Sequence, residues 1–365
     1  MAAAKPTHQL NALGQSLWLD NISRALLASG RLRQYRDELS VTGLTSNPSI
    51  FDEAIRRGSD YDTAIGQAPA GADDEQVFFD LAMQDLREAA QIFADIHTRT
   101  QGVDGWVSLE LSPLLADDTA ASIAQARKLH DAANLPNIYI KIPGTPAGVP
   151  AIEESIFAGI PVNVTLLFSR EQTMAAAEAY LKGIERRLND GKSPVVESVL
   201  SLFVSRWDVA IKDKVSAECR NKLGIAIAQR TYRAWRELLA SERWKKLAAA
   251  GAHAQRLLWA STGTKDPTAP ETLYVEALAA PGTIDTMPDK TLQAFAKSGR
   301  VGAAMPEDGG DCERVIDEIR RQGVDVDALA LKLQQDGGDA FAKSWHSLIG
   351  GLEDKVARLT ATSPS

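Results

Sequence analysis

Short apolar runs alternate with longer amphipathic stretches along the whole chain. Eight runs are rich in β-branched and aromatic residues or alternate between apolar and polar: Ser16–Leu19, Leu39–Leu44, Trp106–Leu111, Asn137–Ile142, Ile160–Phe168, Val195–Val204, Arg256–Ala260 and Gly282–Met287. Such runs are typical of strands. The stretches between them have helical period, for example the one-sided apolar stripe from Phe78 to Ile96. The pattern therefore predicts an α/β fold.

Eight strands separated by helices favour a (β/α)8 TIM barrel with additional helices over a doubly wound open sheet, which usually needs fewer strands. We expect one domain over residues 1–365, because no linker-like change in composition interrupts the chain. Extra helices are expected before the third strand, after the sixth and in the tail. Glycine pairs at 309–310, 337–338 and 350–351 are expected to punctuate that tail.

Two helix starts carry capping signals. Asp73 precedes Gln76 by three residues, and Ser169 precedes Gln172 by the same spacing. Both pairs fit the capping box, in which two side chains satisfy the first free backbone N–H groups of a helix.

Composition narrows the class of protein. The net charge of −8 argues against a nucleic-acid binder, and no apolar run is long enough to span a membrane. Two cysteines cannot make a disulfide framework, and the first residues, MAAAKPTHQL, lack the apolar stretch of a secretory signal. We therefore expect a cytoplasmic protein.

Cofactor and metal motifs are missing. The five histidines are scattered without an HExxH pattern, and no Cys-x-x-Cys, G-x-G-x-x-G or G-x-x-x-x-G-K-[ST] motif occurs. We expect neither a metal nor a cofactor.

Polar side chains follow or end most of the predicted strands, where the barrel fold places active sites. They are Asp20, Asn47, Glu110, Lys141, Asn163, Thr165, Ser201, Arg206 and Ser261. One amine, two carboxylates, several amides and hydroxyls, and one guanidinium suit the chemistry of a carbonyl compound with an anionic group.

Lys141 is the most informative of them. On a strand covered on both faces, an ammonium must find a partner, reach water or lose its proton. A neutral amine can attack carbonyl carbon and form a Schiff base. The alternative is a packed stem with a solvated head.

Other positions have structural alternatives as well. Asp20 could cap the next helix, Asn47-Pro48 could be an ordinary turn, and Arg206 could pair with Asp208 or extend to solvent. Asn163 is harder to explain structurally, because an amide on an otherwise apolar strand needs hydrogen-bond partners.

Three stretches resemble the transaldolases of the pentose phosphate pathway, in their longer bacterial form. They are Thr45–Ser49 (TSNPS), Ile140–Pro143 (IKIP) and Asn163–Phe168 (NVTLLF), and the similarity continues from Trp18 to the C-terminal helices. The resemblance implies a class I aldolase barrel that works without metal on sugar phosphates. It implies no nucleic-acid or membrane partner, and the sequence leaves a monomer or a homodimer open.

The resemblance also implies catalytic roles. Lys141 would form the Schiff base with C2 of a ketose phosphate, and Asp20 would take the proton from the C4 hydroxyl as the C3–C4 bond breaks. Glu110 and Thr165 would hold a water that transfers protons while the imine forms.

Substrate contacts follow from the same resemblance. Asn47 and Asn163 would bind hydroxyls of the dihydroxyacetone unit with help from Ser201, and Arg206 and Ser261 would bind the phosphate.

One position departs from the family pattern. Many transaldolases have a second phosphate-binding arginine two residues after the serine that Ser261 matches, and here that position is Gly263. We hypothesise that Lys265 supplies the missing charge.

Two other functions fit part of the pattern. A fructose 6-phosphate aldolase shares the fold and the lysine but releases free dihydroxyacetone, and its relatives are shorter and tend to use a tyrosine in acid–base catalysis. A non-catalytic barrel that binds or regulates is the second alternative, which the set Asp20, Glu110, Lys141 and Thr165 disfavours.

Overall fold

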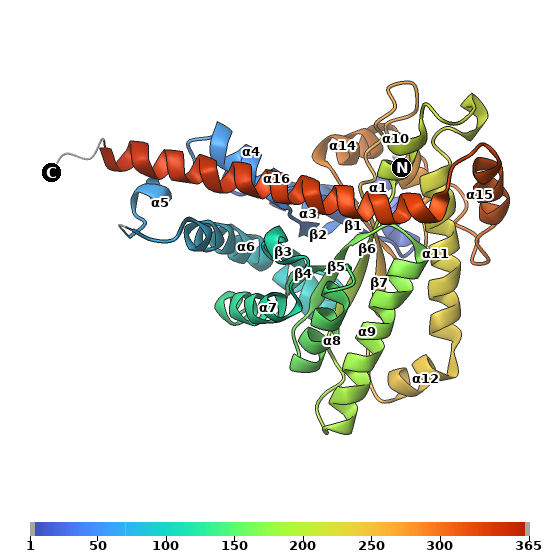
Figure 1. The fold of residues 1–365 in the computed structure, drawn as a ribbon, viewed down its shortest axis with the longest axis horizontal. Helices are drawn as coiled ribbons and strands as arrows, with labels where there is room; N and C mark the ends of the chain where they lie inside the picture. Colours follow the sequence, from blue (N-terminus) through green and yellow to red (C-terminus); the bar gives the residue numbers. More distant parts are fainter. Residues whose placement is uncertain (1–3, 70, 362–365) are drawn as a thin grey trace.

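Eight parallel strands close into a barrel in the computed structural model, which describes residues 4–69 and 71–361 (Figure 1). The strands are β1 Ser16–Asp20, β2 Val41–Thr45, β3 Val107–Glu110, β4 Ile138–Pro143, β5 Val162–Leu167, β6 Ser198–Phe203, β7 Arg256–Ala260 and β8 Ile284–Met287. Each strand pairs with the next one in the chain, and β8 pairs with β1. The predicted TIM barrel is confirmed, and the open sheet is excluded.

Helices surround the barrel and extend it at three places. They are α1 Pro6–Ala12, α2 Arg24–Ala28, α3 Arg31–Leu39, α4 Pro48–Arg57, α5 Asp62–Gly66, α6 Asp74–Arg99, α7 Thr119–Ala133, α8 Gly148–Ala158, α9 Arg170–Asn189, α10 Ser205–Ile211, α11 Leu223–Ala240, α12 Glu242–Ala249, α13 Leu273–Ala277, α14 Asp289–Ser298, α15 Cys312–Arg321 and α16 Val326–Ala361, with short 3-10 turns at Pro113–Leu115 and Ala217–Cys219. Helices α4 and α5 precede the third strand, α11 and α12 follow the sixth, and α15 and α16 form the tail. These are the places where extra helices were expected.

Some predicted strand boundaries were wrong. Leu39, predicted to open the second strand, ends helix α3 instead, and Ser40 then turns the chain in the left-handed conformation with φ 57°. Val195 was also predicted to be in a strand, but β6 begins only at Ser198. Apolar runs alone do not separate a helix end from the strand that follows it.

An aromatic cluster fills the amino-terminal half of the barrel. The Trp106 and Tyr139 rings stack with centroids 4.0 Å apart, and Trp18 lies 6.2 Å from Tyr139. Gly43 on β2 makes room for them, because a Cβ there would lie 2.6 Å from the Trp106 carbonyl oxygen and 2.8 Å from the Trp18 ring. With this end packed solid, the carboxyl ends of the strands are the part of the barrel that can hold polar groups.

The two capping predictions have opposite outcomes. Ser169 and Gln172 form the full capping box of α9, with reciprocal side-chain to backbone bonds. Asp73 stands at the N-cap of α6 but makes no capping bond, and the Gln76 amide donates to Asp80 instead, at 2.8 Å. The capping box predicted for Asp73 and Gln76 was therefore wrong.

Helix α16 continues through two of the glycine pairs that were expected to interrupt it. It runs unbroken from Val326 to Ala361 and crosses the barrel from α15 toward α4 and α5 (Figure 1). Two of its glycines sit at close contacts, because a Cβ would lie 3.0 Å from Leu166 at Gly337 and 2.7 Å from Arg56 at Gly351. Packing against the barrel and α4 thus outweighs the low helix propensity of glycine. Gly309 and Gly310 do break the chain before α15, both with positive φ.

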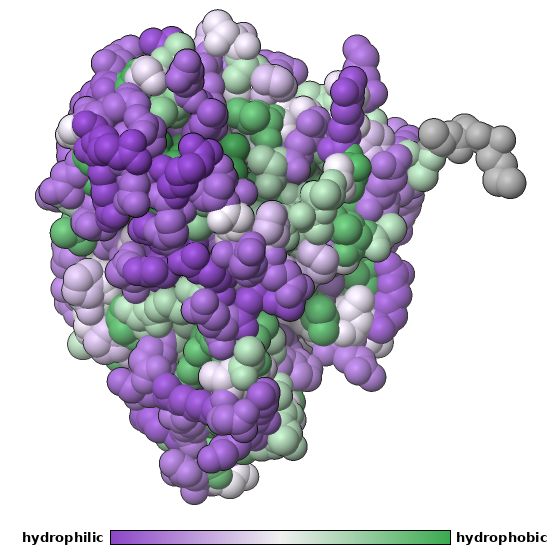
Figure 2. Space-filling model, turned by 90° about the vertical axis from the view of Figure 1, so that its right-hand side faces the viewer, coloured by the Kyte–Doolittle hydropathy of each residue, from purple (hydrophilic) through white to green (hydrophobic). Residues whose placement is uncertain are grey.

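The surface in Figure 2 is largely hydrophilic, with hydrophobic residues in small separate groups. Among the described residues, large exposed apolar side chains are few and scattered in sequence, for example Val103, Leu114 and Val195. Among the described helices, none is long and apolar enough to cross a bilayer.

We predict that Ser169→Ala lowers the free energy of unfolding by about 1 kcal/mol, the usual effect of losing an N-cap hydroxyl. Asp73→Ala is the matched control and should lower it by less than half as much, because Asp73 makes no capping bond. Urea denaturation measures both changes. Equal losses would contradict this account of the two helix starts.

Candidate active site

A cavity of about 120 Å³ opens at the carboxyl ends of the barrel strands. Eight of the ten predicted site residues line it: Asp20, Asn47, Lys141, Thr165, Ser201, Arg206, Ser261 and Lys265. The other two stand directly behind this lining, Glu110 against Lys141 and Asn163 against Ser201. The barrel thus brings together residues that are up to 245 positions apart in the chain.

Lys141 is buried and paired. Its side chain is 7% exposed, and Nζ lies 2.9 Å from Oε2 of Glu110 and donates to the Ser46 carbonyl at 2.9 Å. The two paired residues face each other in the register between β3 and β4. The alternative of a packed stem with a solvated head is therefore wrong.

Glu110 is a carboxyl held against that amine. Burial raises its pKa, and the Lys141 charge opposes the rise, while the nearby Asp20 adds to it. A carboxyl whose pKa is raised accepts protons more readily than an ordinary one, and it lies within hydrogen-bond distance of the amine. The geometry therefore allows a proton to pass between the two groups.

Asp20 faces the cavity and caps no helix. Ser23 caps α2 instead, by accepting from the Leu26 amide. The Thr45 hydroxyl donates to Oδ1 of Asp20 at 2.9 Å, and Thr45 in turn lies 2.7 Å from the Thr286 hydroxyl. The pKa of Asp20 is raised by burial, and the charges of Lys141 and Lys265 and the Thr45 hydrogen bond partly oppose that rise. This carboxyl is suited to take and return a proton.

Thr165 carries a buried hydroxyl without a partner in the described part of the chain. Buried hydroxyls normally form hydrogen bonds, so this one is free for a water or a substrate atom. Its neighbour Asn163 makes two side-chain hydrogen bonds inside the barrel. Asn163 faces Lys141 in the register of β4 and β5, donates to Ser108 at 3.1 Å and accepts from Ser201 at 2.7 Å.

Asn47 has a structural role and lies at the cavity as well. Its Oδ1 accepts from the Ile50 amide at 3.1 Å, which caps α4 ahead of Pro48. Asn47 is therefore a helix cap rather than part of an ordinary turn, and no partner of its side-chain NH₂ is found among the described residues.

Arg206 is a half-buried cation beside two aromatic rings. Its Cζ lies 5.3 Å from the Phe203 centroid and 5.9 Å from that of Phe341 on α16. Burial lowers its pKa. Pairing with Asp208, one of the alternatives, does not occur, because Asp208 accepts from the Leu223 and Gly224 amides at the start of α11. A half-buried guanidinium that pairs with no carboxylate of the described residues suits an anionic ligand.

The loop after β7 lines the same end of the cavity as Arg206, which we call the anion end. Ser261 adopts φ 57°, and its hydroxyl lies 2.9 Å from that of Ser205. A Cβ added at Gly263 would lie 3.9 Å from Nζ of Lys265. The amine of Lys265 thus stands beside the position that an arginine occupies in many transaldolases.

The cavity is also lined by residues that were not predicted as site residues from the sequence, among them Thr45, Thr286, Phe203 and Phe341. Thr45 and Thr286 could have been found as hydroxyls near the ends of β2 and β8, by the reasoning that found Thr165. Phe341 carries no such signal, because it lies on a tail helix whose position depends on tertiary packing.

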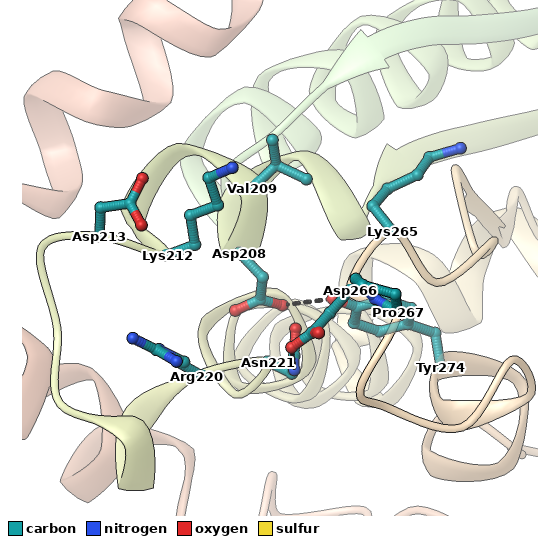
Figure 3. Close-up of a pocket in the computed structure, with 10 residues that line it drawn as sticks. All are labelled: Asp208, Val209, Lys212, Asp213, Arg220, Asn221, Lys265, Asp266, Pro267 and Tyr274. Atoms are coloured by element: carbon teal, nitrogen blue, oxygen red, sulfur yellow. Dashed lines mark hydrogen bonds between the residues drawn. The ribbon is translucent and has the colours of Figure 1, made fainter.

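A second cavity, of about 220 Å³, lies beside α10 (Figure 3). Its buried carboxyl, Asp208, is already satisfied by two backbone amides and by the Tyr274 hydroxyl at 2.8 Å, and burial raises its pKa to about 6. The Lys265 side chain points away from the other lining residues in this view. The second cavity therefore has the features of a helix-capping region rather than of a reactive site.

No three His, Cys, Asp or Glu side chains within residues 4–69 and 71–361 are grouped in a way that could hold a metal ion. Cys219 and Cys312 are buried free thiols.

We predict that Asp20→Asn lowers kcat by at least about 100-fold, the usual contribution of a proton-transferring group, and stabilises the fold at neutral pH. Because burial raises the pKa of Asp20, the folded chain keeps that proton to higher pH than the unfolded chain does. The wild-type free energy of unfolding therefore falls, relative to the variant, as the pH rises from about 4 through the raised pKa.

Urea denaturation at pH 5 and pH 8 measures the difference between variant and wild type, which should grow with pH. Asp37→Asn is the matched control: the Arg36 hydrogen bond lowers the pKa of that surface carboxyl, so it is ionised in the folded and the unfolded chain at both pH values, and its stability difference should not change between them. A stability difference that is the same at both pH values would contradict the assignment for Asp20.

Comparison with known proteins agrees with this arrangement. Residues 17–352 match the family described as Transaldolase/Fructose-6-phosphate aldolase. A protein named Transaldolase from Arthrobacter sp. (strain FB24) is 42% identical over 362 residues, which cover 96% of this chain and 98% of the relative. Similar proteins of the same name occur in Renibacterium salmoninarum, 41% identical with 96% of both chains covered, and in Thermobifida fusca, 40% identical with 97% and 99% covered. This chain belongs to the Transaldolase/Fructose-6-phosphate aldolase family.

Proposed function

We propose that this chain is a transaldolase. It would transfer a dihydroxyacetone unit from sedoheptulose 7-phosphate to glyceraldehyde 3-phosphate, giving erythrose 4-phosphate and fructose 6-phosphate in the non-oxidative pentose phosphate pathway. The observation that carries the proposal is the buried contact between Lys141 and Glu110, 2.9 Å apart at the base of the cavity.

The first half-reaction attaches the donor to Lys141. Glu110 takes a proton from the ammonium, and the neutral amine adds to C2 of the ketose. A water held by Glu110 and the free hydroxyl of Thr165 moves protons as the carbinolamine loses the C2 oxygen as water. The product is a protonated imine on Lys141.

Asp20 then drives the bond cleavage. Its carboxylate takes the C4 hydroxyl proton, the C3–C4 bond breaks, and the electron pair moves into the imine to give an enamine. Erythrose 4-phosphate leaves as an aldehyde. The acceptor aldehyde binds, the enamine carbon attacks it, and Asp20 returns its proton to the new hydroxyl. Hydrolysis of the imine releases fructose 6-phosphate.

The dihydroxyacetone unit needs hydrogen-bond partners during this exchange. The free NH₂ of Asn47 and the linked pair of Asn163 and Ser201 lie next to Lys141 and would bind its hydroxyls. Three fixed partners would hold the enamine in one orientation while the acceptor arrives.

The phosphate would bind at the other end of the cavity. Arg206 contributes a guanidinium that two aromatic rings hold, Ser261 a hydroxyl, and Lys265 a compact positive charge beside Gly263. The lysine can replace the missing arginine as a point charge, without the two parallel hydrogen bonds of a guanidinium.

Transfer is favoured over simple aldol cleavage by the acid–base groups present. The described cavity lining contains no tyrosine, whereas Glu110 and Thr165 stand on either side of Lys141 in the barrel. We place the enzyme in the cytoplasm as a monomer or a homodimer, in keeping with its two buried free thiols.

Borohydride reduction in the presence of fructose 6-phosphate should leave a stable adduct on Lys141, located by peptide mass spectrometry, because reduction traps the imine. Lys141→Met should leave no adduct. An adduct on another lysine, or none on the wild type, would overturn the mechanism and favour the non-catalytic alternative.

Lys265→Ala should raise KM for a phosphorylated donor about tenfold, the effect of losing one charge-assisted contact, and leave KM for an unphosphorylated ketose nearly unchanged. Lys212→Ala is the matched control, because Lys212 lines the second cavity instead. Steady-state kinetics with both donors measures the split. An equal rise for both donors would exclude the phosphate role.

Coupled assays with and without an aldose acceptor should show release of free dihydroxyacetone much slower than transfer. Comparable rates would make the chain a fructose 6-phosphate aldolase.

A further inference from the structure

Strand β5 has an irregular residue directly after Thr165. Leu166 adopts φ 57°, a left-handed conformation that is strained for a residue with a branched side chain. The register between β5 and β6 shifts at the same place, since Val164 faces Leu200 but Leu167 faces Leu202. One extra residue of β5 is thus accommodated in a bulge.

The bulge decides which way the side chains around Thr165 point. In a regular strand, successive side chains alternate between the two faces. Here Leu166 packs with Phe168, Phe203 and Phe341 on the side of the tail helix, while Leu167 belongs to the other apolar cluster, between strands and helices. A regular strand would move these side chains, and with them the Thr165 hydroxyl.

Gln334 on α16 closes over this bulge. Its amide nitrogen donates to the carbonyl oxygens of Gly144 and Leu166, both at 3.0 Å, and the side chain is buried. The Gly144 amide donates to the Thr165 carbonyl at 2.8 Å. Both N–H groups of the Gln334 amide therefore join the end of β4 to the bulge of β5.

Close packing holds the helix in place above these bonds. Gln334, Gly337 and Phe341 lie at helical spacings of three and four and so share one face of α16. Gly337 lets that face approach, because an added Cβ would lie 3.0 Å from Leu166 and 3.4 Å from Nη1 of Arg206. Phe341 lies against Phe203, with centroids 6.5 Å apart.

We propose that Gln334 is a positioning residue, which holds the β5 bulge so that the Thr165 hydroxyl faces the Lys141–Glu110 pair. The inference deepens the proposed function and rests on it, because it concerns the group that would hold the water used in imine formation. Without the amide, two buried carbonyls lose their donor and the strained Leu166 loses its support. The helix that covers the barrel thus takes part in the chemistry through a residue 169 positions after Thr165.

The test uses Gln334→Met, which keeps nearly the same shape and removes the donors. We expect kcat to fall at least about tenfold, equal to ~1.4 kcal/mol of transition-state stabilisation, with KM and inhibition by inorganic phosphate changed less than about twofold. Rapid quenching with borohydride should show slower imine formation. Gln335→Met is the matched control, because Gln335 is the adjacent, exposed residue of the same helix.

A second variant separates positioning from general destabilisation. Leu166→Gly placed in the Gln334→Met background should recover part of the lost imine-formation rate, because glycine adopts the left-handed conformation without strain. A variant that had lost activity through destabilisation alone would lose more with Leu166→Gly, since this change also removes a buried side chain.

Amide hydrogen exchange gives a readout that does not depend on activity. Exchange at Gly144 and around Thr165 should be faster in Gln334→Met than in Gln335→Met, with the other barrel strands unchanged. If exchange is faster in Gln334→Met but borohydride traps no imine on the wild type, the positioning role stands and the proposed function is refuted. If the wild type forms the imine and Gln334→Met forms it as fast as Gln335→Met does, the positioning role is refuted.

Discussion

A charged amine in the interior of a barrel is stable only if something compensates for the water it has lost. Glu110 provides that compensation for Lys141, at 2.9 Å and with both side chains 7% exposed. Removing one partner of a buried ion pair costs about 3–5 kcal/mol, because the other charge is left alone. The same burial makes the pair useful, since it raises the pKa of the Glu110 carboxyl, so that a proton can pass between the two groups. The surrounding structure keeps this pair buried and aligned.

The two ends of the barrel differ in composition and in role. Aromatic rings pack against Tyr139 in the amino-terminal half, where they contribute to the apolar core. The carboxyl ends carry the polar groups, and neighbouring strands supply hydroxyls and amides that bond to one another rather than to water, as Ser201 does to Asn163. Such linked side chains keep their orientation without substrate, and preorganised partners of this kind are what electrostatic catalysis requires.

At the anion end, the positive charge is left unpaired by the described residues, in contrast to the charge of Lys141. Arg206 lies half-buried beside two aromatic rings and pairs with no carboxylate of the described residues, so its charge remains available. The rings restrict the guanidinium without neutralising it. One of them, Phe341, comes from α16, and so the tail helix shapes the phosphate end as well as the strand that carries Thr165.

The sequence by itself determined the eight strands, the capping box of α9 and nine of the ten residues gathered at the cavity, because each depends on a local signal; Lys265 came from the comparison with the family pattern at Gly263. Strand periodicity, a Ser-x-x-Gln pair and a polar residue near a strand end are all read within a few positions. Only the tertiary structure decided that α16 continues through Gly337, that Arg206 leaves Asp208 to cap α11, and that Leu166 turns left-handed beneath Gln334. Each of these depends on contacts between distant segments, and packing energy there overrides the local preference of glycine for helix ends, of arginine for a nearby acid and of leucine for negative φ.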